Sequence, residues 1–316
     1  MQAVVIEDKR LRLIERPTPV PRPHDVLVEV HAAGVNAADL LQRDGYYPAP
    51  LGWPADVPGL EMSGTVLRVG SSADGELVGR RVCAIVGGGA QATHCLVPAE
   101  HLLFVPDHEG WDQAGGFAEA YVTAYDALVI QAGTRSGDRV LISGAAGGVG
   151  NAAVQVAHAC GAHVTAVTRS AHHHQRLRDL GADEAIVISE VTALEPVDVV
   201  LELVGDAHLA SAQQVLAPRA RVVIIGVSGG GGRVELDLLG LMTRRATLTG
   251  STLRARSRQE KADVIARVNE FVLPRWSSSE LRVPVARAFD FADVESAYAY
   301  FAQPGKFGKV IVRTAR

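Results

Sequence analysis

A strand that runs through glycines directly into a helix is the part of this sequence best suited to bind a ligand. Residues 140–157 read "VLISGAAGGVGNAAVQVA". The dinucleotide-binding fingerprint has glycine at three offsets, which Ala145, Gly147 and Gly150 occupy here. Gly147 lets the backbone approach a pyrophosphate, Gly150 lets the helix lie close to the strand, and the helix N-terminus offers N–H groups to phosphate. We predict a dinucleotide site, rather than a structural glycine turn, with phosphate contacts from Ala146, Gly147, Gly148 and Val149.

The end of the next expected strand indicates which dinucleotide binds. An NAD-binding chain carries an acidic residue about 20 positions beyond the glycines, where it holds the ribose 2′-hydroxyl. This chain has "VTRSAHHH" there, with Arg169 followed by Ser170 and no carboxylate nearby. A guanidinium pairs with a phosphate monoester through two hydrogen bonds. The sequence therefore favours NADPH, and the plainer alternative is that Arg169 is a solvated residue at a strand end.

Three consecutive histidines, His172, His173 and His174, raise the question of a metal site. Consecutive residues of a helix point about 100° apart, so these side chains do not converge on one ion. We therefore predict no metal ligands. His173 is instead expected to assist in binding the 2′-phosphate.

A neutral amide and two phenols stand close together in "AAGVNAADLLQRDGYYP", residues 32–48. The amide of Asn36 is neither a base nor a nucleophile, but it can hold a carbonyl oxygen by a hydrogen bond. Asp39 is expected to cap a local helix rather than to act as a base. Tyr46 offers an O–H donor or a flat ring for a substrate.

The elements that would position these residues fall into two kinds. Residues 1 to about 100 show short β-rich runs separated by proline and glycine, such as "DVLVEVHAAGV" and "RVCAIVG". After a helical pattern at 112–133, apolar strands alternate with helices, which predicts a doubly wound parallel sheet. The segment from about residue 256 is too short for a domain and is expected to pack on the β-rich part. We therefore predict one domain from residues 1–117 and 257–316 and a dinucleotide-binding domain from residues 118–256.

Composition limits the classes of partner. The chain has 316 residues, a formal net charge of −4 and a pI of about 6.3, which argues against nucleic acid or an anionic membrane as main partner. The arginine-rich stretch at 244–258 is read as a solvated interdomain segment rather than an RNA-binding one. Three distant cysteines and the absence of a signal peptide or a spanning run predict a cytoplasmic protein.

Taken together, these motifs resemble the medium-chain dehydrogenase/reductase superfamily, and within it the zinc-independent, zeta-crystallin-like quinone oxidoreductases. The resemblance covers essentially the whole chain, and "PGLEMSGTVLRVG", "YVTAYDAL", "STLRARS" and "GKFGKVIV" add to it. It implies an α/β fold with a GroES-like, mostly β catalytic domain and a Rossmann coenzyme domain. The zinc branch has a cysteine at the position of Asn36 and a histidine at that of Leu60, so a catalytic zinc is not expected.

The resemblance also implies roles for individual residues. Asn36 and Tyr46 would contact the acceptor or the nicotinamide, and we expect both side chains to lie outside the core. Thr123 would face the nicotinamide, with walls formed by Val204, Gly205, Gly226, Val227 and Leu253. This chain departs from the group near the 2′-phosphate, where His173 replaces a common lysine and Ile188 a common tyrosine, and Arg169 would compensate.

The function expected from these observations is NADPH-dependent reduction of a quinone, with hydride passing to the acceptor without a protein nucleophile or a metal. One alternative is reduction of an enone or enoyl double bond. Another is an NADPH-binding protein without physiological turnover, such as a sensor or a crystallin-like protein. The resemblance also implies that two copies pair through the last strand of the Rossmann sheet, which is "ATLTGS" here, residues 246–251. This strand has no proline or lysine to protect its edge, and we predict a homodimer.

Overall fold

The computed structural model describes residues 1–229 and 232–314. The chain divides into two compact units, unit 1 with Met1–Val122 and Leu253–Arg316 and unit 2 with Thr123–Thr252. The predicted domain boundaries, after residues 117 and 256, lie a few residues from these divisions. The last two residues of the predicted C-terminal segment lie outside the described residues. Each unit is described by itself.

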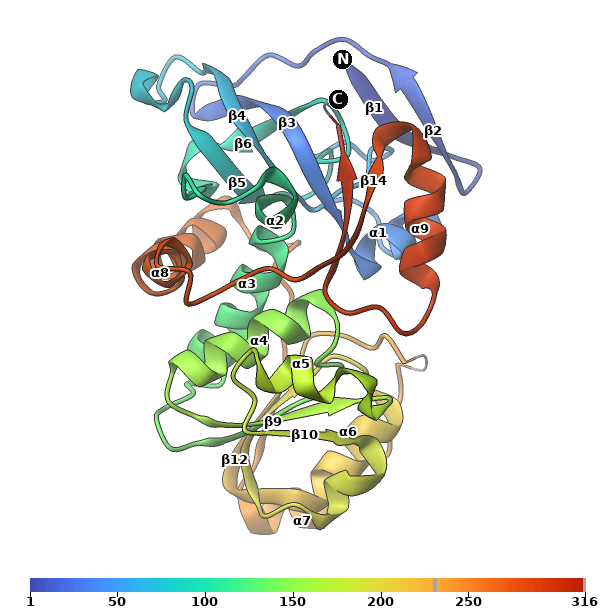
Figure 1. Ribbon diagram of the computed structural model, residues 1–316, viewed down its shortest axis with the longest axis vertical. Helices are drawn as coiled ribbons and strands as arrows, with labels where there is room; N and C mark the ends of the chain where they lie inside the picture. Colours follow the sequence, from blue (N-terminus) through green and yellow to red (C-terminus); the bar gives the residue numbers. More distant parts are fainter. Residues whose placement is uncertain (230–231, 315–316) are drawn as a thin grey trace. The chain divides into compact units, whose positions relative to one another are not determined.

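Unit 1 is built on a seven-stranded sheet with the order β14-β15-β3-β4-β5-β7, in which β6 also pairs with β3, next to a β1-β2 hairpin (Figure 1). Its strands are β1 (Gln2–Glu7), β2 (Arg10–Glu15), β3 (Asp25–Val35), β4 (Glu61–Val69), β5 (Arg81–Ile85), β6 (His94–Pro98), β7 (Leu102–Phe104), β14 (Val285–Asp290) and β15 (Lys309–Arg313). Its helices are α1 (Ala37–Arg43), α2 (Trp111–Gly115), α8 (Arg258–Ser277) and α9 (Val294–Ala302), with short 3-10 helices η1 (Gly75–Leu77), η2 (Ala99–His101) and η7 (Phe291–Asp293).

The order of strands in unit 1 brings distant parts of the chain together. Val26, Val28 and Val30 alternate along β3 and enter one apolar core with Met62 and Val82 of the neighbouring strands. β15 pairs antiparallel with β3 on its other side. The C-terminal segment thus packs on the β-rich part, as its length predicted.

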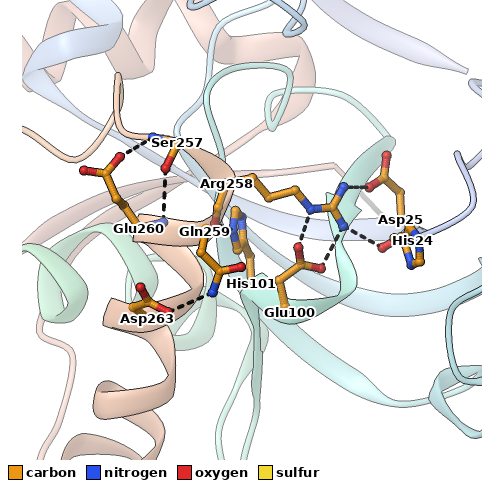
Figure 2. Close-up of polar contacts among 9 residues, drawn as sticks. All are labelled: His24, Asp25, Glu100, His101, Ser257, Arg258, Gln259, Glu260 and Asp263. Carbon is orange, nitrogen blue, oxygen red and sulfur yellow. Dashed lines mark hydrogen bonds and ion pairs between the residues drawn. The ribbon is translucent and has the colours of Figure 1, made fainter.

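Helix α8 is fixed to unit 1 at its first turn (Figure 2). Ser257 caps the helix and Glu260 returns the hydrogen bond, forming a capping box. The Arg258 guanidinium lies 2.9 Å from the Asp25 carboxylate and also pairs with Glu100. This clamp joins the helix to the start of β3 and to the turn after β6.

Unit 2 holds a six-stranded parallel sheet with the order β10-β9-β8-β11-β12-β13, which confirms the predicted doubly wound arrangement. Its strands are β8 (Arg139–Ile142), β9 (His163–Thr168), β10 (Glu184–Val187), β11 (Val197–Glu202), β12 (Leu216–Ile224) and β13 (Thr247–Gly250). Its helices are α4 (Gly148–Ala159), α5 (His174–Arg178), α6 (Asp206–Ala212) and α7 (Leu238–Arg244), with 3-10 helices η4 (Ala171–His173), η5 (Ile188–Ala193) and η6 (Gln213–Val215). The chain leaves β8 toward β9 on one side and returns to β11 on the other, so the strand order reverses between β8 and β11.

The helix expected over residues 112–133 is interrupted, which corrects the sequence-based interpretation. The structure has α2, then α3 (Ala118–Tyr125), then one π-helical segment, η3 (Asp126–Gln131). A Cβ on Gly115 would lie 2.9 Å from the Cβ of Ala32, and one on Gly116 would lie 2.9 Å from Cγ of Lys309. The two glycines let the backbone press against the sheet of unit 1, and the helix breaks there. None of the helices in the described residues is both long and apolar enough to cross a membrane.

Candidate functional site

The glycine loop of unit 2 has the geometry that the fingerprint predicted. Gly147 is the N-cap of α4. A Cβ on Gly150 would lie 2.5 Å from the carbonyl oxygen of Gly144, so only glycine allows the helix to approach the turn this closely. Gly144 has a φ of +59°, a conformation that glycine adopts without strain. Because the turn glycine stands one position earlier, the first fingerprint position tolerates Ala145.

The other predicted phosphate contacts surround the start of α4. Ala146 lies in the turn, and Gly148 and Val149 are the first two residues of the helix. The first N–H groups of a helix have no intrahelical acceptor and carry the positive end of its dipole. These half-buried residues therefore present donors to an anionic ligand at the carboxyl end of β8.

Arg169 follows the last residue of β9 and is exposed, as is Ser170. Within residues 1–229 and 232–314, the Arg169 guanidinium forms neither a hydrogen bond nor an ion pair. The Thr168 hydroxyl donates to the carbonyl oxygen of Ser170 at 2.9 Å and shapes the turn. The guanidinium is therefore available to an anionic group beyond the end of β9.

The three histidines differ in burial and contacts, and the rings of His172 and His173 meet edge to face with their centres 4.9 Å apart. His173 is buried, with 6% of its surface exposed, whereas His172 is exposed. The His174 ring lies 3.1 Å from the Thr168 hydroxyl. In the described part of the chain, His, Cys, Asp and Glu side chains form no group of three that could hold a metal ion.

The residues predicted to line the nicotinamide pocket in unit 2 lie mostly at the carboxyl ends of its central strands. Val204 and Gly205 follow β11, and Gly226 and Val227 follow β12. The Thr123 hydroxyl is buried and has no hydrogen-bond partner in the described residues. Since burying a hydroxyl without a partner is costly, this position fits a ligand that supplies one. Leu253, the last predicted wall residue, belongs to unit 1 and is buried.

In unit 1, Asn36 is part of a buried polar cluster. Its Oδ1 accepts a hydrogen bond from Lys309 Nζ at 2.6 Å, and its Nδ2 donates to Glu61 Oε1 at 3.1 Å. Lys309 and Glu61 form an ion pair and are 4% and 0% exposed. A Cβ on Gly34 would collide with the Glu61 carboxylate, so glycine is required beside it. The expectation that Asn36 lies outside the core is wrong, because its amide joins these two charged groups.

Two further carboxyl groups surround this cluster. Asp39 accepts hydrogen bonds from the N–H of Asn36 at 2.8 Å and of Gly59 at 3.0 Å, which confirms its predicted capping role. Burial raises the pKa of Asp39 to about 6. Burial, and then the nearby Glu61 carboxylate, raise the pKa of Glu119 to about 7. The Glu119 side chain forms no hydrogen bond in the described residues, and its carboxyl group therefore stays free to take up a proton near neutral pH.

Tyr46 does not join this cluster. Its side chain is 77% exposed, in the turn that follows α1. The turn is held by Arg254, whose guanidinium donates to the carbonyl oxygen of Tyr47 at 2.9 Å and lies 4.9 Å from the centre of that ring. Asn36 and Tyr46 thus stand in different surroundings, one buried among charges and the other open to solvent.

Sequence reasoning missed Lys309, Glu119 and Glu202. No local pattern marks Lys309, because its partner Asn36 lies 273 positions away in the chain. The two glutamates did leave a signal, since each stands inside an apolar run, "FAEAYV" and "VLELVG". Glutamate is seldom buried, so a glutamate inside an apolar run marks a position where burial has to be explained.

Two family profiles match the chain. Residues 22–134 match the alcohol dehydrogenase GroES-like domain, and residues 148–270 match zinc-binding dehydrogenase. Together with the parallel sheet of unit 2, these matches confirm the predicted fold class, a GroES-like domain and a Rossmann-type coenzyme domain.

Similar proteins narrow the family further. The chain is 30% identical over 322 residues to quinone oxidoreductase-like protein 2 from Bos taurus, which covers 98% of this chain and 91% of that protein. A quinone oxidoreductase from Thermus thermophilus, also solved with NADPH, is 32% identical with a TM-score of 0.85, covering 99% of this chain and 100% of the other. An NAD-dependent alcohol dehydrogenase is 25% identical with a TM-score of 0.87 and full coverage of both chains. The chain therefore belongs to the quinone oxidoreductase-like branch of the medium-chain dehydrogenase/reductase superfamily, as its motifs predicted.

Proposed function

We propose that this oxidoreductase is an NADPH-dependent reductase that transfers hydride to a quinone and needs no catalytic zinc. Its Rossmann-type unit accounts for a nicotinamide dinucleotide as cofactor. The observation that carries the choice of NADPH is Arg169 at the end of β9, where an NAD-binding chain would have an acidic residue. Its guanidinium has no partner among the described residues. The names of its relatives support a quinone as the acceptor.

The cofactor would be held by groups of unit 2 that have no other partner in the part of the chain that the structure describes. The N–H groups at the start of α4 would bind the pyrophosphate, and Arg169 would bind the 2′-phosphate. The buried Thr123 hydroxyl would gain a hydrogen bond from the nicotinamide end. When bound, NADPH supplies a hydride from C4 of its ring, and the protein contributes orientation, which is worth about 7–11 kcal/mol in well-aligned reactions.

The cluster around Lys309 supports a reaction without zinc. A tetrahedral catalytic zinc needs three protein ligands. Here an amide, Asn36, and an alkyl side chain, Leu60, stand at two of the positions that are ligands in the zinc branch. The ammonium group of Lys309 already bonds Asn36 and Glu61, so the chain supplies its own cation beside the remaining carboxylate. Activity should therefore survive exhaustive chelation, and elemental analysis should find less than one zinc per chain.

Asn36 and Tyr46 are proposed to act on the acceptor. Asn36 Nδ2 donates to Glu61 at 3.1 Å and makes a longer contact, 3.5 Å, with the carbonyl oxygen of Gly34. A hydrogen bond to the carbonyl oxygen of an acceptor would replace this longer contact. Asn36→Ala and Tyr46→Phe should lower kcat/KM for the acceptor, by less than the 2.7–4 kcal/mol (about a hundredfold to a thousandfold) lost when a preorganised oxyanion donor is removed. If both variants react at the wild-type rate, the two residues have a structural role and do not act on the acceptor. An equal fall in NADPH affinity would place Asn36 in the cofactor site instead.

Steady-state turnover with matched panels of quinones and enones tests the acceptor class. Under the proposal, NADPH is oxidised faster with quinones than with enones of similar size. Faster turnover of enones would establish reduction of a conjugated double bond as the activity. Tight NADPH binding with no turnover on either panel would point to a protein that binds the dinucleotide without catalysis.

We further propose that the protein is a homodimer formed through β13. This strand pairs with β12 on one side and is the last strand of its sheet. It contains neither proline nor lysine, residues that commonly protect an edge from pairing. Pairing with the same strand of a second copy would extend the sheet across a two-fold axis.

A further inference from the structure

Glu202 is the last residue of β11, which lies where the strand order of unit 2 reverses. Ligands of doubly wound sheets bind outside the carboxyl ends of the strands at this point. Glu202 is fully buried, with 0% of its surface exposed. It is therefore an acidic group placed inside the protein at the edge where a dinucleotide is expected.

Three hydrogen bonds converge on one oxygen of this carboxyl group. Glu202 Oε1 accepts from the Ser143 hydroxyl and from the N–H groups of Val204 and Gly205, each at 2.7 Å. Ser143 follows β8, and its hydroxyl oxygen accepts from the N–H of Leu203 at 2.7 Å. All three groups are donors, and a carboxylate is a hydrogen-bond acceptor only. The same bonds fix the backbone of residues 203–205, which includes two of the residues proposed to wall the nicotinamide.

Among the described residues, the carboxyl group of Glu202 has no ion-pair partner. No Lys, Arg or His side chain in the described residues forms an ion pair with it, and its Oε2 is buried without a hydrogen bond. His208, on α6, is close enough for the charge of Glu202 to raise its pKa, but burial has the larger effect and lowers that pKa. The imidazole is therefore neutral near pH 7. Burying a charge without a counter-ion costs free energy, and we infer that this carboxyl group interacts with a bound ligand.

We propose that Glu202 stabilises the oxidised, positively charged form of the bound nicotinamide cofactor relative to the reduced form, and so favours hydride donation. The proposal rests on the function proposed above. Loss of hydride removes one hydrogen nucleus and two electrons from the neutral dihydropyridine ring, leaving a pyridinium cation, while the acceptor takes the hydride and then a proton from water. A fixed anion beside the loop that walls the ring attracts only the product form of this pair.

Dissociation constants of NADP⁺ and NADPH, measured by nicotinamide fluorescence and by competition, test this without turnover. Glu202→Gln removes the charge and keeps an oxygen that accepts the loop hydrogen bonds. It should weaken NADP⁺ relative to NADPH by about three- to tenfold, as expected for two unit charges separated by several ångströms in a partly solvated site. Ser143→Ala is the matched control, because it removes one of the three hydrogen bonds but leaves the charge. Its ratio of the two constants should stay within about twofold of the wild type.

If Glu202→Gln does not fold, a second pair of variants still tests the proposal. Glu202→Asp and Glu202→Asn have the same size and differ in charge, so only the asparagine variant should shift the ratio. Equal ratios in charged and neutral variants, or an equal shift in Ser143→Ala, would overturn the inference and leave Glu202 with a structural role. A wild type that binds neither dinucleotide would instead refute the proposed function, and this inference with it.

Discussion

Under the proposed function, the side chain of Arg169 selects NADPH over NADH. A charge-assisted hydrogen bond contributes about 1.5–3 kcal/mol, so Arg169→Ala should weaken NADPH binding by that amount and leave NADH binding nearly unchanged. Arg178→Ala, an exposed arginine of α5, is the control and should leave both affinities as in the wild type. Titration of nicotinamide fluorescence measures both. Equal affinities of the wild type for NADPH and NADH would contradict the assignment.

Glu119 gives the stability of unit 1 a dependence on pH. Its pKa is raised from 4.5 to about 7, so the folded protein holds this proton more tightly than the unfolded chain. The resulting stabilisation is complete below pH 4.5 and is lost as the pH rises through about 7. Glu119→Gln, which stays neutral, should match the wild type at pH 4.5 and be more stable at pH 8 by about 1–3 kcal/mol.

Denaturant unfolding at the two pH values measures this difference. Glu270→Gln, an exposed glutamate of α8, should show no such dependence on pH. If Glu119→Gln is less stable than the wild type at pH 8, the carboxylate makes a favourable interaction that outweighs its burial.

At the level of single residues, the sequence predicts what depends on local spacing. Arg169 follows from its distance to the glycine loop, and Asp39 follows from its position in the first turn of α1. The contacts of Asn36 could not be predicted in the same way. Its partners Glu61 and Lys309 lie 25 and 273 positions away, and only the pairing of β3 with β4 and β15 brings them together.

At the level of elements, the start of α8 is held by an ion pair that acid should break. The pKa of Glu100 is lowered to about 2, mainly by its hydrogen bond with Arg258 (Figure 2). This stabilisation is present above pH 4.5 and is lost as the pH falls toward 2. Arg258→Met should therefore lower Tm at pH 6 and have a smaller effect at pH 3. Because the Glu100 side chain is 39% exposed, solvent screening keeps the difference in stability between the two pH values below about 1 kcal/mol.

Arg267→Met, at an exposed position of α8, is the control for this experiment. It should change Tm by the same small amount at both pH values. A loss in Arg258→Met that is as large at pH 3 as at pH 6 would assign the role of Arg258 to packing of its alkyl chain rather than to its charge.

The elements that sequence could not place are those decided by contacts across the chain. Long apolar strands such as β3 and β11 and the helix α4 were predicted from their own residues. The interruption of the expected helix at Gly115 and Gly116 was not, because it depends on how closely the backbone meets Ala32 and Lys309. Short strands such as β7 were missed for a similar reason, since three residues carry too little periodicity of their own.

For the whole molecule, alternation of strands and helices was sufficient to predict the parallel sheet of unit 2. The return of the C-terminal segment to unit 1 was predicted from its length alone. Sequence did not show that its strand β15 would deliver a lysine to the cluster around Asn36. A single strand pairing thus completes both the sheet and the candidate site of unit 1.

Exposed apolar side chains on α7 support the proposed dimer through the edge strand β13. Leu238, Leu239 and Met242 are 66%, 69% and 72% exposed on this helix. The short turn after α7 leads directly into β13, so a second copy that pairs with the strand would also cover apolar side chains.

Light scattering at micromolar concentration should give the mass of a dimer. Leu239→Glu should shift it toward the monomer, while Val78→Glu, an equally disruptive change at an exposed position of unit 1, should not. A monomeric wild type would refute the dimer, and a dimer that withstands both Leu239→Glu and Thr249→Pro would place its interface elsewhere.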